Sequence, residues 1–312
     1  TEMANALEIS ATVMELPSKK FGEPKTLSSS LGIKAMPGLM HDGENVLAIW
    51  TECSSDNYLL MDGTNRLKTC LYSEGKWKQE NTIFETENTI VQLETDKSSF
   101  IPRTAFVVNM NQELKEGKGY ELFLFQEGEI KRLSSDEVID AEPRFAEFEG
   151  ESALFTCHGN DIAYRKESSW ENPIIITEPD GQKVDSKFQV FTNEEQVWIM
   201  YSSDSGKEDG KGLYALIYDK EEERWGQPVQ LIKSEGCLYN FSGFQDRNAQ
   251  FHVVYMQMKE NMDIADMKTQ IISPYTDIAI LGEPVYYPSD VKSGCDIPVM
   301  TKIINQGLKK VT

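Results

Sequence analysis

Short runs in which apolar and polar residues alternate recur along the whole chain. They include SKFQVFT at 186–192, PRFAEFE at 143–149 and YNFSGFQ at 239–245, and a tight polar turn and a strongly apolar run, such as QVWIMYS at 196–202, follow each of them. Alternation with a period of two residues, bounded by Gly, Asn and Asp, indicates strands, and no segment carries a 3.6-residue apolar stripe over ten positions. The pattern predicts a chain that is nearly all β.

A short phrase, an aromatic or aliphatic residue followed by a proline, separates these groups of strands. It reads FGEPKTL, SWENPIIIT, RWGQPVQLI and LGEPVYY in four places. Aligned on this phrase, the chain has anchors, in steps of 56, 53, 40, 55 and 56 residues, at Phe21, Trp77, Ile130, Trp170, Trp225 and Leu281. A repeat of about this length is typical of propeller blades. We expect the ring of each phrase to pack between neighbouring blades and its proline to suit an outer strand.

The strand count predicts the number of blades. Five complete repeats lie between the chain ends, and a ring of four-stranded blades protects its sheet edges. The N-terminal segments LEISATVMEL and FGEPKTL fit a third and a fourth strand, while CDIPVMTK and LKKVT near the C-terminus fit a first strand and the start of a second. We therefore predict one domain over residues 1–312, an all-β, six-bladed β-propeller of four-stranded antiparallel blades closed by strands from both termini.

The strand, turn and Trp arrangement resembles the repeats of sialidase-like propellers. In that family the turn between the third and fourth strands carries an Asp-box, Ser-x-Asp-x-Gly-x-Thr-Trp. The segment YSEGKW matches it in shortened form with Ser73, Glu74, Gly75 and Trp77, and YRKESSW and YDKEEERW keep only the entry aromatic and the Trp. The resemblance covers the repeat pattern of nearly the whole chain, and it implies the fold far more than the function.

The sialidase catalytic residues that this resemblance would bring do not carry over. Members that cleave sialic acid have three arginines that grip a carboxylate, a Tyr nucleophile with a Glu partner, and an Asp acid/base. Arg144 opens a first strand, but its counterparts in the other repeats are Ala35, Lys187, Asn240 and a residue near Asp296 or Ile297. Lys and Asn cannot rebuild a bidentate clamp. We expect a sialidase-like scaffold without the arginine triad.

The charge of the chain excludes two classes of partner. With 31 basic and 51 acidic residues the net charge is −20, which repels phosphate backbones and anionic lipid headgroups. No run approaches the roughly 20 apolar residues of a membrane helix. We therefore expect no nucleic-acid partner and no membrane insertion.

The cysteines and histidines do not form a metal motif. The three histidines are scattered, and the cysteines, which lack any C-x-x-C spacing, are Cys53, Cys70, Cys157, Cys237 and Cys295. Cys53 and Cys70 fall on successive strands of one hairpin, so a disulfide between them stays open. Buried single thiols are the favoured interpretation.

The axial face is the expected ligand site. In a propeller, the inner strands and the loops that join second to third strands converge around the axis. The candidate ligand-binding residues there are Lys34, Tyr58, Glu142, Arg144, Asp185, Lys187, Tyr239 and Asp296. Carboxylates from different blades could lie across the funnel as a glycosidase pair, and the two tyrosines could stack on a saccharide ring.

One acidic loop is a weak calcium candidate. Asp204, Glu208 and Asp209 place oxygen ligands close together, as a hard cation requires. The loop lacks the spacing of an EF-hand, and a solvated acidic turn is the favoured interpretation. No other cofactor is expected.

The function that these observations predict is non-catalytic. We expect a binding or interaction propeller for glycan or protein, from a secreted or cell-surface bacterial protein, either a monomer or part of a larger chain. Two alternatives stay open. One is a glycoside-active enzyme, a hydrolase or lyase, which requires two carboxylates in the axial funnel with one raised pKa. The other is a structural spacer domain of a larger surface protein.

Overall fold

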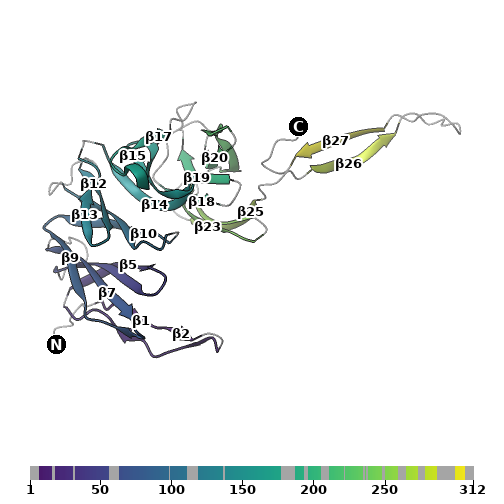
Figure 1. Ribbon diagram of the computed structural model, residues 1–312. Coiled ribbons are helices and arrows are strands. Elements are labelled where there is room, and N and C mark those ends of the chain that lie inside the picture. The colour runs from purple at the N-terminus through teal and green to yellow at the C-terminus, as the bar shows by residue number, and fades with distance from the viewer. Residues whose placement is uncertain are drawn as a thin grey trace. The chain divides into compact units, whose positions relative to one another are not determined.

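Antiparallel strands make up nearly the whole of the computed structural model (Figure 1). It describes residues 7–15, 18–30, 32–55, 63–97, 99–110, 119–135, 138–176, 187–192, 196–204, 211–220, 222–234, 236, 238–247, 250–258, 265–272, 278–286 and 299–305. For residues 204, 239, 265, 278–286 and 299–305 it describes the backbone alone. The described helical structure is one 3₁₀ turn, η1 (Glu167–Ser169). No helix within the described part of the chain is long and apolar enough to cross a bilayer.

Three sheets follow one another in the first half of the chain. The first comprises β5 (Ile33–His41), β6 (Val46–Cys53), β7 (Asn65–Ser73), β8 (Lys76–Trp77) and β9 (Asn81–Thr86). The second comprises β10 (Thr89–Thr95), β11 (Arg103–Asn109), β12 (Tyr120–Gln126) and β13 (Glu129–Arg132). The third comprises β14 (Asp140–Phe148), β15 (Glu151–His158), β16 (Asp161–Lys166) and β17 (Ile174–Ile176). The expected four-stranded antiparallel sheets are confirmed, and the first sheet has a fifth strand because β9 also pairs with β7.

The remaining strands form a fourth sheet, a fifth sheet and three smaller pairs. The fourth sheet runs β18 (Phe188–Thr192), β19 (Gln196–Asp204), β20 (Lys211–Asp219) and β21 (Arg224–Trp225), with β22 (Val229–Lys233) also on β20. The fifth runs β23 (Leu238–Gln245), β24 (Phe251–Met258) and β25 (Ala265–Ile272). The pairs join β1 (Ser10–Ala11) to β4 (Lys25–Thr26), β2 (Met14–Glu15) to β3 (Lys20–Phe21), and β26 (Ile278–Tyr286) to β27 (Val299–Asn305).

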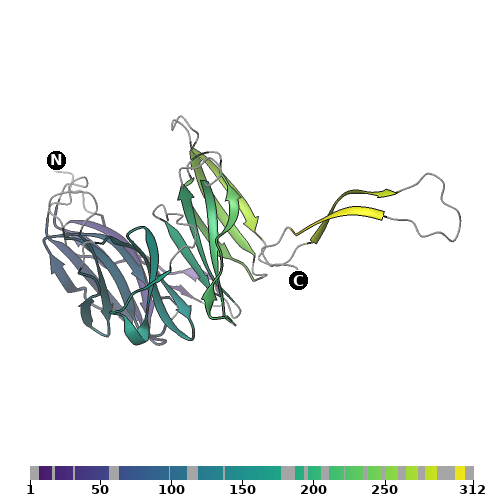
Figure 2. The ribbon, with the colours of Figure 1, turned by 90° about the horizontal axis from the view of Figure 1, so that it is seen from above.

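The first strands of successive sheets lie side by side. Strand β10 packs beside both β5 and β14, and β14 packs beside β18. In Figure 2 the colour passes from purple to teal across the sheets of the first half of the chain. The second strands β6, β11 and β15 are buried over most of their length, on both faces. Such strands read as continuous apolar runs in place of alternating ones, and β11 is buried over all but its last residue.

Aromatic rings fill the space between these sheets. Phe106 and Phe123 stack at 5.3 Å between the first and second sheets, and Trp170 packs edge-on to Phe145 between the second and third. Trp225 stacks on Phe148 at 5.9 Å. The prediction that the repeated phrase supplies inter-sheet rings is therefore confirmed for the last two tryptophans of that phrase.

The structure also shows how far two further tryptophans, one phenylalanine and two cysteines are buried. Trp50 and Trp198 are buried in the second strands β6 and β19. Phe21 was expected to pack between blades, but this is wrong, because its side chain is 70% exposed on the short strand β3. Cys53 and Cys70 are free and buried, which agrees with the favoured interpretation.

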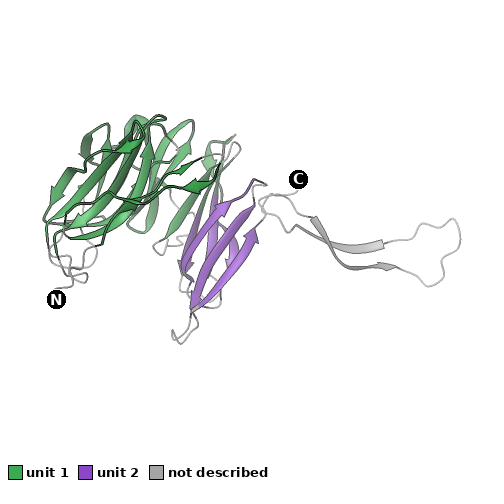
Figure 3. Ribbon diagram, turned by 90° about the horizontal axis from the view of Figure 1, so that it is seen from below, with its two compact units in different colours: residues 1–199, 217–226 green, residues 200–216, 227–312 purple. Residues whose placement is uncertain are grey.

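The chain divides into two compact units (Figure 3). One contains residues 1–199 and 217–226, and the other contains residues 200–216 and 227–312, so the boundary passes through β19 and β20. In the second unit, one face of the β23–β24–β25 sheet carries exposed apolar side chains in register, namely Phe244, Val254, Met256, Met267 and Ile271. A contiguous apolar patch of this kind marks a contact surface.

A buried arginine links the second and third sheets. Arg103 is fully buried, and its Nη1 lies 3.4 Å from Asp96 Oδ2, while its Nε donates to Gln126 Oε1 at 3.2 Å. It also pairs with Glu167. The Ser152 hydroxyl donates to Asp96 at 2.7 Å. Arg103 thus joins Asp96, which follows β10, to Gln126 on β12 and Glu167 in η1, and Asp96 in turn binds Ser152 on β15.

We expect Arg103→Met to lower the free energy of unfolding by about 3–5 kcal/mol, because Asp96 would then be a buried charge without its cation. Urea denaturation of both proteins measures the difference. Arg224→Met is the matched control, since Arg224 pairs with Glu222 in solvent and its loss should change stability by less than about 1 kcal/mol. Equal small effects of the two substitutions would contradict a structural role for Arg103.

Candidate functional site

A backbone bulge delivers one acidic side chain near the start of β14. Glu142 has a φ of 52° and precedes Pro143, and the pairing of β14 with β15 shifts register between Ala141 and Arg144. Strand β5 has the same feature, with Met36 at a φ of 51° before a proline. A left-handed φ costs a non-glycine residue about 1–3 kcal/mol. The bulge is therefore a feature of the repeat, and in the third sheet it carries a carboxylate.

Glu142 is held by partners from two strands. Gln92 on β10 donates through Nε2 to Glu142 Oε1 at 2.9 Å, and its Oε1 accepts the backbone N–H of Glu142 at 2.7 Å. On the other carboxylate oxygen, Arg144 Nη2 donates at 2.7 Å. The side chains of Glu142 and Arg144 remain 15% and 29% exposed. Each carboxylate oxygen thus has one fixed donor, and the group stays open to solvent.

A second carboxyl group, that of Glu94, lies two residues beyond Gln92 on β10. Burial raises the pKa of Glu94, and the nearby carboxylates of Glu142 and Asp96 raise it further. Arg144 and Lys97 act in the opposite direction, and the net shift is upward. A protonated carboxyl beside an ionised one is the arrangement that general acid–base catalysis requires.

The surroundings of the pair contain further polar groups. Asp140, at the start of β14, is fully buried, and its Oδ1 lies 3.2 Å from His158 Nδ1 and 3.5 Å from Arg165 Nη2. This cluster fixes the end of β14 that precedes Glu142. Burial raises the pKa of Cys157 to about 12, so this thiol is not a nucleophile at neutral pH.

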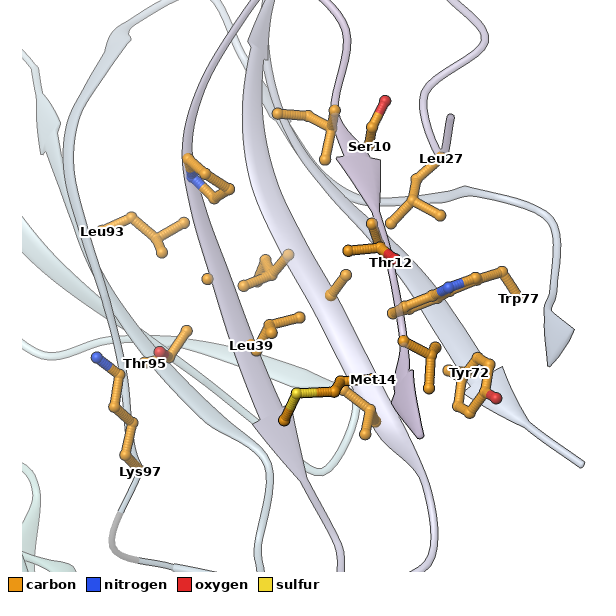
Figure 4. Close-up of a pocket in the computed structure, with 18 of the residues that line it drawn as sticks. Ser10, Thr12, Met14, Leu27, Leu39, Tyr72, Trp77, Leu93, Thr95 and Lys97 are labelled. Atoms are coloured by element: carbon orange, nitrogen blue, oxygen red, sulfur yellow. The ribbon is translucent and has the colours of Figure 1, made fainter. Parts of the chain in front are cut away.

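A cavity of about 760 Å³ adjoins Glu94 (Figure 4). Its walls come from the segment that contains β1 and β2 and from the first two sheets, and they are mostly apolar. The rings of Tyr72 and Trp77, 5.1 Å apart, form part of the wall. Glu94, Thr95 and Lys97 line it as well. The side chains of Leu93 and Thr95 face Gly38 at this wall. Because side chains alternate along a strand, the Glu94 side chain points to the opposite face of β10, where Arg144 and Glu142 lie.

Two of the predicted ligand residues lie together in the structure, whereas a third, Lys34, lies in a separate buried network. Glu142 and Arg144 form the ion pair described above. Lys34 is buried, with its Nζ donating to the carbonyl of Ser30 at 2.6 Å and lying 3.8 Å from Glu52 Oε2. The expectation that Lys34 meets a ligand is corrected, because its charge is taken up by a buried network inside the first sheet.

The other predicted residues are only partly described. Lys187 precedes β18 and is half-buried. Tyr239 and Asp204 lie in β23 and β19, but their side chains are outside the described part of the structure. Tyr58, Asp185, Asp296, Glu208 and Asp209 lie outside the described residues altogether. Within the described residues, no group of three or more His, Cys, Asp and Glu side chains is placed to hold a metal ion.

Sequence reasoning missed Gln92 and Glu94. The segment TIVQLETD carries polar residues at 92, 94 and 96 between apolar ones, which is the pattern of a strand with one polar face. The signal was present, because β10 is the first strand of its sheet, as β5 and β14 are of theirs. It was not read, because the anchors in this repeat are weaker.

Comparison with known proteins gives fold similarity alone. No family model matches the chain, and no curated protein matches it. Among solved structures, a prolyl endopeptidase has a TM-score of 0.51 at 12% identity, over 98% of this chain and 44% of that one. The polysaccharide lyase Uly1 has a TM-score of 0.46 at 11% identity, over 76% and 57%. An endo-arabinase from Bacteroides thetaiotaomicron has a TM-score of 0.40 at 13% identity, over 78% and 95%.

These similarities confirm the coarse fold and correct the expected function. The fold is of the propeller type. This chain spans 44% of the endopeptidase and 57% of the lyase, which is less than two thirds of either protein. The prediction of a non-catalytic binding module is corrected, because the similar structure with a TM-score of 0.51 is an enzyme, a prolyl endopeptidase.

We expect Glu94→Gln to stabilise the protein at about pH 8 and to have no such effect at about pH 4. The native state favours the protonated carboxyl, so the ordinary Glu pKa of 4.5 in the unfolded chain lies below the native one. The stability that Glu94 contributes is present below that value and is lost as the pH rises through the raised pKa. Urea denaturation midpoints at both pH values measure the difference.

The control for this experiment is Glu129→Gln, which changes an exposed carboxylate on β13. Its effect on the midpoint should be small and nearly the same at both pH values. A Glu94→Gln protein that is less stable than the wild type at the higher pH would show that the carboxylate is stabilised in the fold, opposite to our interpretation.

Proposed function

We propose that this chain is a glycoside hydrolase in which Glu94 is the general acid and Glu142 is its ionised partner. The observation that carries the proposal is the meeting of two carboxyl groups from neighbouring first strands. One has a pKa raised by burial, and the other is bound to Arg144 at 2.7 Å. Glycosidases use two carboxyl groups in these two roles.

The proposed reaction follows from the protonation states. Glu94 gives its proton to the glycosidic oxygen as the bond from that oxygen to the anomeric carbon breaks. A water molecule adds to the anomeric carbon, and Glu142 takes the proton that this water loses. Afterwards Glu94 regains a proton from solvent and Glu142 releases one, so the site returns to its starting state. Arg144 and Gln92 keep the Glu142 carboxylate in place throughout.

The finer architecture is part of the proposal. We propose a ring of six blades of the sialidase-like type, as the repeat predicts. The exposed apolar face of the β23–β24–β25 sheet supports it, because a further blade would cover this face in the same way that the third sheet covers the second. The β26–β27 pair follows that sheet in the chain, after a connection of a few residues. An exported location fits a polysaccharide substrate.

We expect the wild-type protein to release reducing sugar from at least one member of a panel of polysaccharides and 4-nitrophenyl glycosides. Glu94→Gln and Glu142→Gln should each lower kcat/KM on the natural substrate by about 10²–10⁴-fold. The kcat/KM profile of the wild type should fall on its alkaline side as Glu94 loses its proton, at a pH above the ordinary Glu range. Reducing-end assays across pH measure both effects.

The leaving group separates the two roles. A nitrophenolate leaves without a proton, so Glu94→Gln should retain much more activity on nitrophenyl substrates than on polysaccharides, whereas Glu142→Gln should lose activity on both. Glu129→Gln serves as the control and should behave as the wild type. Full activity in both site variants, or products that carry the ultraviolet absorbance of an unsaturated sugar, would refute the hydrolase mechanism.

A further inference from the structure

We propose that the apolar cavity on the first sheet binds a molecule with a long alkyl chain and a carboxylate, such as a fatty acid. A hairpin of residues 9–15 and 20–27, in which β1 pairs with β4 and β2 with β3, covers the cavity. The inference is independent of the proposed hydrolase function, because the Glu94 carboxyl lies on the other face of β10.

Apolar side chains from the hairpin and from the first sheet form most of the cavity wall. The volume of about 760 Å³ falls in the range of small-molecule sites. Val13, Met14 and Leu39 line the cavity, and their side chains are 42%, 42% and 56% exposed. An alkyl chain that enters the cavity removes both its own surface and these side chains from water, which favours binding.

One end of the cavity is polar and favours a carboxylate. Thr95 is 4% exposed, and its hydroxyl has no hydrogen bond to any residue that the structure describes. Lys97 is exposed, and no described carboxylate lies within ion-pair distance of its ammonium group, whose charge acts on Glu94 from farther away. Figure 4 shows both side chains on the same side of the cavity. A hydroxyl and an ammonium group are two donors from which one carboxylate can accept hydrogen bonds.

The strands that the cavity crosses indicate a long chain as the apolar part of the ligand. Tyr72 on β7 and Trp77 on β8 line the side opposite Thr95 and Lys97, with Leu39 of β5 between the two ends (Figure 4). Neighbouring strands are about 4.8 Å apart, so β5 and β7 are separated by about 10 Å. Strand β10 packs beside β5 and adds to this span. An alkyl chain can reach from the polar end to Trp77, whereas a single aromatic ring cannot.

The test titrates the full chain with dodecanoate, below the concentration at which it forms micelles, by isothermal titration calorimetry. Dodecanoate should bind the wild type, and octanoate should bind about tenfold or more weakly than dodecanoate, because it buries fewer methylene groups. Leu39→Trp fills the cavity and should weaken dodecanoate binding by about tenfold or more. Leu71→Trp is the matched control, because Leu71 is exposed on the same sheet and outside the cavity lining, and it should bind as the wild type.

The carboxylate contact is tested by a second pair of variants. Lys97→Met keeps an unbranched apolar side chain and removes the charge, so it should weaken dodecanoate binding by about tenfold, as expected for one lost charge-assisted contact. Lys76→Met is its control, because Lys76 is exposed on β8 and outside the cavity lining, and this variant should bind as the wild type.

Three results would overturn the proposal: no binding of dodecanoate, binding unchanged in Leu39→Trp, or equal binding by Lys97→Met and Lys76→Met. Tighter binding of 2-naphthoate, an aromatic carboxylate, than of dodecanoate would overturn the assignment to an alkyl chain. None of these results bears on the turnover of glycosides, so the proposed hydrolase function is tested separately by its own assays.

Discussion

The reciprocal hydrogen bonds between Gln92 and Glu142 join two sheets at their first strands, and the candidate site depends on them. A side-chain amide of β10 binds both the backbone N–H and the carboxylate of one residue on β14. This fixes the bulge in which Glu142 lies, although a left-handed φ is unfavourable for glutamate. With Glu142 held by this bond and by Arg144, Glu94 sits beside an ordered negative charge, and its own ionisation becomes unfavourable.

The site is built on a scaffold that has little freedom to move. The sheets on either side are packed through Phe106, Phe145 and Trp170, and Arg103 joins their edges through buried ion pairs. Rigid neighbours matter because catalytic carboxyl groups must be held close to their working geometry before substrate arrives. The same packing leaves the cavity beside β10 open, where β1 and β4 are strands of only two residues and cover the first sheet thinly.

Sequence alone predicted the scaffold well and the site in part. Period-two alternation and the repeated phrase predicted the all-β sheets and the packing of Trp170 and Trp225 between sheets. Glu142 and Arg144 were among the predicted ligand residues because both open a recognisable first strand. Glu94 was missed and Lys34 misassigned, because contacts between sheets decide which polar side chains remain available. Lys34 meets Glu52 within its own sheet, whereas the pKa of Glu94 is raised first by burial and then by Glu142, 48 residues away. In the sequence, the bulge corresponds to a proline at the same place in two first strands, in AMPG at 35–38 and in AEPR at 141–144.

The central claim is that Glu94 and Glu142 form a coupled pair in which the carboxyl group of Glu94 ionises less readily than an ordinary glutamate. Carbon-13 NMR titration of the glutamate carboxyl groups, assigned by Glu94→Gln, tests it most directly. We expect Glu94 to titrate above the ordinary value of 4.5, and its pKa to fall in Glu142→Gln, where the neighbouring negative charge is gone. A Glu94 that titrates in the ordinary range, with no response to that substitution, would contradict the claim.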